Sequence, residues 1–171
     1  MLSLTGCIVA DPPQYEEPKR TPPILDLDHA EPSPYWPVIV ERKDGVDLQL
    51  KVLLRSDDQG EKLWFAVHFD YKANTHIKWP SLPIPPSTLD QPPRVISFGL
   101  ELDDARVKPG CHQITLLVAH DSSWDHTNAQ PLPEAPDDDL ASATWWMNVD
   151  PSVADNPFTL PDCASQSEVQ Q

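Results

Sequence analysis

The stretch that decides the fold is Val107-Lys108-Pro109-Gly110-Cys111-His112-Gln113-Ile114-Thr115-Leu116-Leu117-Val118-Ala119-His120. Its Pro-Gly pair predicts a turn, and the residues after the turn predict one strand. Ile114, Leu116 and Val118 fall on one face of that strand, whereas Gln113 and Thr115 fall on the other, which is the period of two of a half-buried strand. The rest of the chain must therefore supply other strands that cover this apolar face.

Several other segments show the same alternation of apolar and polar residues. The strongest run covers 46–55, a second covers 63–71, and sustained helical periodicity is absent. We expect the two runs to form a hairpin that shares one hydrophobic face. Together the segments predict an all-β fold of about seven strands in two antiparallel sheets, with a closed barrel as the alternative. The remaining predicted strands are 24–27, 38–40, 75–79, 96–102 and 143–149.

Composition limits the classes of partner. The chain has 171 residues with 12 basic and 27 acidic side chains, a net charge of −15. Such an acidic surface repels phosphate backbones, so nucleic-acid binding is not expected. No apolar run approaches the roughly 20 residues of a membrane-spanning helix. The 21 prolines are dense in 11–37, which predicts a semi-rigid spacer.

The start of the chain resembles a known sequence pattern. Leu4-Thr5-Gly6-Cys7 resembles the lipobox of bacterial lipoproteins, in which the cysteine is lipidated and becomes the mature N-terminus. The basic and apolar parts of a signal peptide are missing, which suggests a start further upstream. The resemblance implies an outer-membrane lipoprotein of the cell envelope, anchored through Cys7. The alternative is an incidental cysteine near the N-terminus.

The run from Leu102 to Val118, with its Pro-Gly turn, resembles the F-strand region of bacterial immunoglobulin-like and fibronectin-III-like modules. That resemblance implies an immunoglobulin-like β-sandwich in a small envelope lipoprotein. The expected organisation is a signal-peptide remnant in 1–6, a tether in 7–35, the sandwich in 36–150 and a tail in 151–171. Once Cys7 is lipidated, Cys111 and Cys163 are left as an even pair in an oxidising compartment, which predicts a disulfide between them. The alternative is two free thiols.

The sequence offers few candidate metal ligands or catalytic residues. His120, Asp125 and His126 are weak candidates for a metal site, because their spacing matches no established zinc pattern; we therefore expect no metal and no other cofactor. Asp137-Asp138-Asp139 predicts a solvated acidic loop. No nucleophile elbow or other catalytic arrangement is present, so the sequence predicts a protein that is not an enzyme.

Tryptophan placement suggests a surface for binding. Trp64 and Trp146 fall on the outward parity of their strands, and Trp124 lies in the long acidic loop, so these three form the candidate binding surface. The alternative is that other segments of the chain cover them.

Two functions remain open at this point. The first is a membrane-anchored interaction or scaffold module, with other envelope proteins as partners and a lipid anchor in the membrane. The second is a ligand-binding module for carbohydrate or a divalent metal, using the exposed tryptophans or the segment from His120 to His126.

Overall fold

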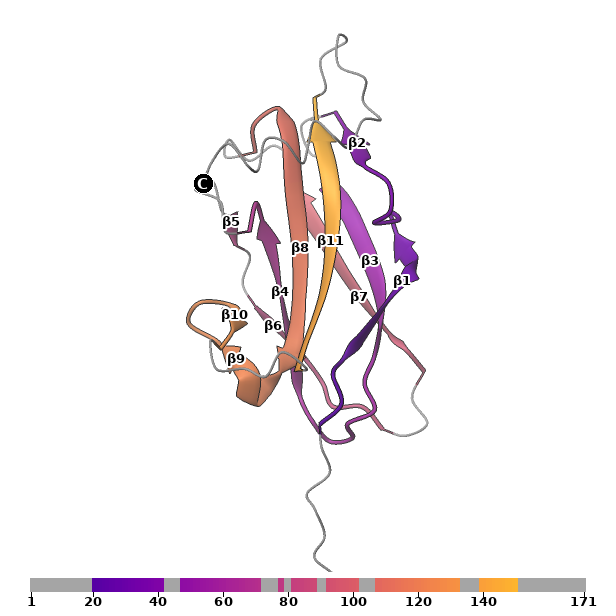
Figure 1. Cartoon of the computed structure of the whole chain (residues 1–171), viewed down its shortest axis with the longest axis vertical. Coiled ribbons are helices and arrows are strands. Elements are labelled where there is room, and N and C mark those ends of the chain that lie inside the picture. The colour runs from indigo at the N-terminus through magenta and orange to yellow at the C-terminus, as the bar shows by residue number, and fades with distance from the viewer. Residues whose placement is uncertain are drawn as a thin grey trace, which may run out of the picture.

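The computed structural model describes residues 20–41, 47–71, 77–78, 81–88, 92–101, 107–132 and 139–150. Within these ranges the chain is built from strands and one short 3-10 turn, and two sheets pack face to face (Figure 1). The prediction of an all-β, immunoglobulin-like sandwich is confirmed. None of the described residues forms a helix long and apolar enough to cross a membrane.

The smaller sheet is antiparallel and has the order β1-β3-β7. Its central strand, β3, pairs with β7 along its whole length, from Asp47 opposite Glu101 to Leu54 opposite Arg94. Alternation places one side of β3 in the core and the other toward solvent. The bounds are Ile24–Glu31 for β1, Asp47–Arg55 for β3 and Arg94–Glu101 for β7.

The larger sheet has the order β2-β11-β8-β4-β5, and β6 also pairs with β4. β8 is the strand predicted from the opening stretch, and it lies between β4 and β11, antiparallel to both (Figure 1). β2 pairs with β11 in parallel. The bounds are Val38–Val40 for β2, Leu63–Phe69 for β4, Ile77–Lys78 for β5, Leu82–Ile84 for β6, Gly110–His120 for β8 and Leu140–Val149 for β11.

The core lies between the two sheets and takes one face of each long strand. Trp145 of β11 is fully buried there, and its ring meets the edge of Phe98 from the opposite sheet with centroids 6.2 Å apart. The alternation identified in the sequence therefore selects the core correctly. Its other long-strand members are Leu50, Val52, Leu54, Leu63, Phe65, Val67, Phe69, Ile96, Leu100, Ile114, Leu116, Val118, Met147 and Val149.

The predicted hairpin between the segments 46–55 and 63–71 is wrong. β3 pairs with β1 and β7, whereas β4 pairs with β8, so the two strands belong to different sheets. The connection 56–62 crosses from one sheet to the other. Both strands still bury their apolar faces in the same core, because facing strands in a sandwich share a core about 10 Å thick as effectively as neighbours in one sheet do.

The boundary of the sandwich also differs from the expected one at residue 36. Ile24–Glu31 is β1, an edge strand whose first residues pair with Arg55, Leu54 and Leu53 of β3. The short edge strand expected at 24–27 is therefore present and longer than predicted. A tether would therefore end before Ile24, where β1 begins. The expected signal-peptide remnant and the tail 151–171 lie outside the described residues.

The start of β8 is fixed to the end of β4 by polar contacts. Gly110 has φ of +124°, a conformation that residues with a Cβ rarely adopt, and it opens β8 directly after the turn. Asp70 accepts a hydrogen bond from the Gln113 N–H at 3.0 Å, and its other carboxylate oxygen lies 2.8 Å from Nδ1 of His112. These contacts set the register of the two strands at that end.

Candidate functional site

The segment that carried most of the predicted ligands folds back over the outer face of the larger sheet. It contains a 3-10 turn, η1 (Asp121–Ser123), and two short strands, β9 (Trp124–Asp125) and β10 (Gln130–Pro131), which pair with each other. We call residues 121–132 the flap. Figure 1 shows it beside the lower ends of β4 and β8. The sequence placed this segment in a long acidic loop; the structure adds the 3-10 turn and the two short strands.

A second, smaller apolar cluster lies beneath the flap. Trp124 is only 3% exposed, so it is not part of an exposed binding surface. Trp64 is half-buried, and its ring meets His126 edge-on with centroids 4.4 Å apart. His68 donates a hydrogen bond from Nε2 to the Ala129 carbonyl at 2.9 Å. The cluster consists of Ala66, Leu117, Ala119, Trp124 and Ala129, with Trp64 and Tyr71 packed against it.

His120 is the last residue of β8, directly before the flap, and is fully buried. Its Nδ1 is hydrogen-bonded to Asp139, and its Nε2 lies 3.3 Å from a carboxylate oxygen of Asp58. Both ring nitrogens of His120 therefore face carboxylate groups. The contact between His120 and Asp139 joins the two ends of the connection between β8 and β11. Asp139, expected in a solvated loop, is 3% exposed.

The weak metal candidates do not converge. Asp125 accepts hydrogen bonds from the backbone N–H groups of Thr127 and Asn128, at 2.9 and 3.2 Å, and so shapes the turn at the tip of the flap. His126 is exposed and pairs with Asp121 at 3.2 Å, whereas His120 is buried and pairs with Asp139. Over the part of the chain that is described, no three His, Cys, Asp or Glu side chains form a group suited to a metal ion.

Trp146 and the cysteines are the remaining residues that the sequence singled out. Trp146 lies on the outer face of β11, opposite Gln113 of β8, and is half-buried. Cys111, at the start of β8, is disulfide-bonded. Cys7 and Cys163 lie outside the described residues, so the pairing of Cys111 with Cys163 and the lipidation of Cys7 stay predictions.

Among the described residues, the most exposed aromatic side chains lie elsewhere, in the crossover from β1 to β2. We call residues 32–37, with the sequence Pro-Ser-Pro-Tyr-Trp-Pro, the aromatic loop. Trp36 is 74% exposed and Tyr35 is 57% exposed. The prolines before and after this pair are a signal that could have singled it out, because proline lacks the N–H that would place the pair in a ladder.

Contacts to both sheets hold the aromatic loop in place. The buried Trp145 donates a hydrogen bond from Nε1 to the Pro32 carbonyl at 2.8 Å. The Tyr35 hydroxyl donates to Asp28 of β1 at 3.1 Å, and the Tyr35 N–H donates to Ser33 Oγ at 3.4 Å. The hydrogen bond to Asp28 is the main cause that raises the pKa of Tyr35 above its ordinary value. The loop thus presents its aromatic rings from a fixed backbone.

A groove adjoins this loop on the outer face of the smaller sheet, with a volume of about 610 Å³. Its apolar part includes Leu53 of β3 and Val95 of β7, which is 62% exposed. Asp28 belongs both to the groove and to the anchor of Tyr35. Charged groups along the rim pair with each other, as Lys51 and Glu31 do at 3.5 Å. The groove and the aromatic loop together combine exposed apolar surface with a polar rim.

Asp26 lies on the same strand as Asp28 and contacts two basic side chains. The side-chain hydrogen bond from His29 is the main cause that lowers the pKa of Asp26 below its ordinary value. Arg55 lies 4.0 Å from the same carboxylate. Asp26 therefore keeps its charge at neutral pH.

Comparisons with known proteins do not show a family for this chain. No family model matches the chain, and no curated protein matches it. Among solved structures, the chain is similar to a CARDB domain of a protein from Pyrococcus furiosus, solved in complex with di-metal ions. The identity is 15%, the match covers 82% of this chain and 99% of that chain, and the TM-score is 0.38. The assignment of the sandwich rests on the sheets of the chain itself.

Proposed function

We propose that this chain is a membrane-tethered, non-enzymatic interaction module of the bacterial cell envelope, which binds a partner protein through the aromatic loop and the adjoining groove. The observation that carries the proposal is that Trp36 is 74% exposed although its loop is hydrogen-bonded to both sheets. A solvent-exposed tryptophan on an ordered loop has no role in the core.

Fixed aromatic side chains are effective anchors for binding. A tryptophan buries about 150–250 Å² when a partner covers it. Because the loop is already ordered, little conformational entropy is lost on association. Trp36 and Tyr35 therefore have the properties of interface hot spots, with the groove at Leu53 and Val95 extending the apolar area.

Charge indicates the chemistry of the partner. The chain carries a net charge of −15, and Asp28 and Glu31 lie on the rim of the groove. A partner surface with an apolar centre and a basic rim complements this arrangement. Such complementarity raises the rate of association and its dependence on salt.

The lipobox at Leu4 to Cys7 supports the membrane anchor. If Cys7 carries the lipid, the residues up to Arg20 can span at most about 45 Å when fully extended. The sandwich would then stay close to the membrane surface, where partners in the same envelope layer are within reach.

The test is a binding comparison between two tryptophan variants of the full chain. Trp36→Ala removes the exposed ring of the aromatic loop, and Trp146→Ala removes the outward tryptophan of β11 that the sequence favoured. Partners would be cross-linked in envelope extracts, identified, and then titrated in purified form. We expect Trp36→Ala to weaken binding by about tenfold or more and Trp146→Ala to leave it nearly unchanged.

Two results would count against the proposal. The first is an identified partner that binds Trp36→Ala as tightly as the parent chain. The second is an intact mass without lipid on Cys7, for a chain expressed in a Gram-negative host with its upstream start. This result would refute the membrane anchor, and the binding test with Trp36→Ala would then decide on the interaction surface.

A carbohydrate ligand at the same surface is the second candidate. It is favoured by the exposed Tyr35 and Trp36 rings beside the carboxylates of Asp28 and Glu31, since aromatic faces stack on sugar rings and carboxylates accept hydrogen bonds from hydroxyls. Saturable binding of an oligosaccharide that is lost in Trp36→Ala would assign the surface to this ligand. The metal alternative is not supported, because the candidate ligands do not converge.

A further inference from the structure

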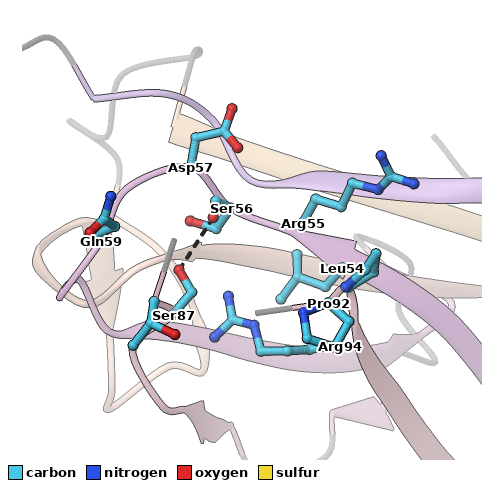
Figure 2. A pocket seen from close by; sticks show the side chains of 10 residues that line it. Leu54, Arg55, Ser56, Asp57, Gln59, Ser87, Pro92 and Arg94 are labelled. Carbon is cyan, nitrogen blue, oxygen red and sulfur yellow. Dashed lines mark hydrogen bonds between the residues drawn. The ribbon is translucent and has the colours of Figure 1, made fainter. Parts of the chain in front are cut away.

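A second cavity lies at the end of the sandwich where β3 ends and β7 begins. It has a volume of about 400 Å³ and is separate from the aromatic loop and the groove. Three segments build it: the end of β3 with the start of the following connection, the segment after β6, and Pro92–Arg94. Figure 2 shows these side chains around the opening.

The polar groups of this cavity include two that lack partners. Ser56 Oγ and Arg94 Nη2 are buried, and neither forms a hydrogen bond with any described residue. A buried hydroxyl or guanidinium N–H without a partner costs about 1–3 kcal/mol, so such groups mark a place where a ligand can restore the missing bonds. In Figure 2 the Arg94 guanidinium points across the cavity toward Ser87.

The neighbouring contacts fix this arrangement. Arg94 Nη1 donates to the Pro85 carbonyl, and Ser87 Oγ donates to the Ser56 carbonyl at 3.2 Å. Gly60 N–H donates to the Ser87 carbonyl at 3.3 Å, which joins the same two segments again. Burial lowers the pKa of Arg94 from its ordinary value, yet an arginine stays protonated at neutral pH. The cavity therefore holds a cation that is already oriented.

The other charged residues of the lining do not compete for the interior. Figure 2 shows the Asp57 carboxylate and the Arg55 guanidinium pointing away from the cavity. Arg55 lies instead 4.0 Å from Asp26. One inward cation and no inward carboxylate among the lining residues favour a monoanion over a dianion such as phosphate.

An apolar wall completes the cavity. Leu54, Pro92 and Pro93 line it beside the polar groups. A guanidinium with adjacent hydroxyls binds the planar carboxylate group well, and an apolar wall adds contacts for a hydrocarbon substituent.

We propose that this cavity is a binding site for a carboxylate that bears an apolar group. Arg94 and Ser56 bind the carboxylate oxygens, and Pro92 with Pro93 contacts the apolar group. The ligand is either a free small acid or the C-terminal residue of a protein chain, since both present the same chemistry. This site does not depend on the function proposed for the aromatic loop.

The test is a calorimetric titration of the full chain with four probes: N-acetyl-leucine, its uncharged amide, a tetrapeptide acid ending in leucine, and the matching peptide amide. We expect saturable binding of the acids and about tenfold or more weaker binding of both amides, because the charge-assisted hydrogen bonds are lost. A peptide acid that binds more tightly than N-acetyl-leucine assigns the site to a chain terminus. Equal affinities of the two acids assign it to a free small acid.

Matched variants test the residues. Arg94→Gln should weaken binding of N-acetyl-leucine by about tenfold or more. Arg55→Gln, which removes an equal charge that points away from the cavity, should change it by less than about twofold. Ser56→Ala should weaken binding severalfold without lowering the melting temperature, because Ser56 Oγ has no partner among the described residues. This variant keeps the test valid if Arg94→Gln fails to fold.

Four results would overturn the proposal. The acids and the amides could bind equally. Arg55→Gln could lose as much affinity as Arg94→Gln, or inorganic phosphate could bind more tightly than either acid. Failure of all acids to bind at millimolar concentration would have the same consequence. Trp36→Ala should leave carboxylate binding unchanged, so this test and the test of the aromatic loop can fail separately.

Discussion

Replacing Trp124 tests the most consequential difference between sequence and structure, the flap over the larger sheet. The sequence places Trp124 on a binding surface, whereas the structure buries it to 3% exposure against Ala66, Leu117 and Ala119. Trp124→Ala should therefore destabilise the protein strongly. Trp36→Ala should leave stability nearly unchanged, because Trp36 is 74% exposed.

The expected magnitude follows from two opposing contributions. Truncation of a buried tryptophan to alanine typically costs about 3–5 kcal/mol of unfolding free energy, from lost burial and the cavity left behind. Trp124 Nε1 is buried without a hydrogen-bond partner among the described residues, and removing it recovers roughly 1 kcal/mol. The net loss for Trp124→Ala should be about 2–4 kcal/mol.

Urea denaturation followed by far-ultraviolet circular dichroism measures this loss. With an m-value of about 2 kcal/mol/M, the midpoint should fall by roughly 1–2 M for Trp124→Ala and hardly move for Trp36→Ala. Trp124→Phe keeps most of the apolar body and removes the unpartnered N–H, so it should cost less than about 1.5 kcal/mol. Equal midpoints for Trp124→Ala and Trp36→Ala would refute the buried flap.

Two further predictions concern the contacts that order the loops. The folded pKa of Tyr35 is raised above its ordinary value, so the stability from its bond to Asp28 is fully present below about pH 10 and is lost as pH rises through the folded pKa. A tyrosinate absorbance titration should show one high-pKa tyrosine that disappears in Tyr35→Phe and returns toward the ordinary value in Asp28→Asn; no change in Asp28→Asn would contradict this. His120→Ala leaves the carboxylate of Asp139, 3% exposed, without its partner and should cost about 3–5 kcal/mol in urea denaturation. The cost should be clearly smaller in an Asp139→Asn background, and equal costs in the two backgrounds would argue against an energetic coupling between His120 and Asp139.

Much of the fold could be predicted because strand alternation is a local property. The apolar parity of Ile114, Leu116 and Val118 follows from the period of two, and all three are buried in the core. The same holds for Trp145, Met147 and Val149 on β11. The pairing of strands could not be predicted in the same way, which is why β3 and β4 were expected in one hairpin.

The candidate site was less accessible to prediction. Residue type identified Trp64, Trp124 and Trp146 as candidates, but exposure depends on which distant segment covers each ring. The flap covers Trp124 and contacts Trp64, and neither contact leaves a pattern in the sequence. Similarly, the sequence shows Asp139 only as part of an acidic run and does not indicate its contact with His120.

The sequence by itself determined the class of fold, the core faces of the long strands and the acidic character that disfavours nucleic acids. These are properties of single segments and of composition. Only the tertiary structure decided that Trp124 is buried, that Trp36 is exposed on an anchored loop, and that Ser56 and Arg94 line one cavity. The physical reason is that the exposure of a side chain depends on how separate strands pack against one another. The same packing brings together Ser56 and Arg94, which are 38 positions apart in the sequence (94 − 56). Strand periodicity does not encode this packing.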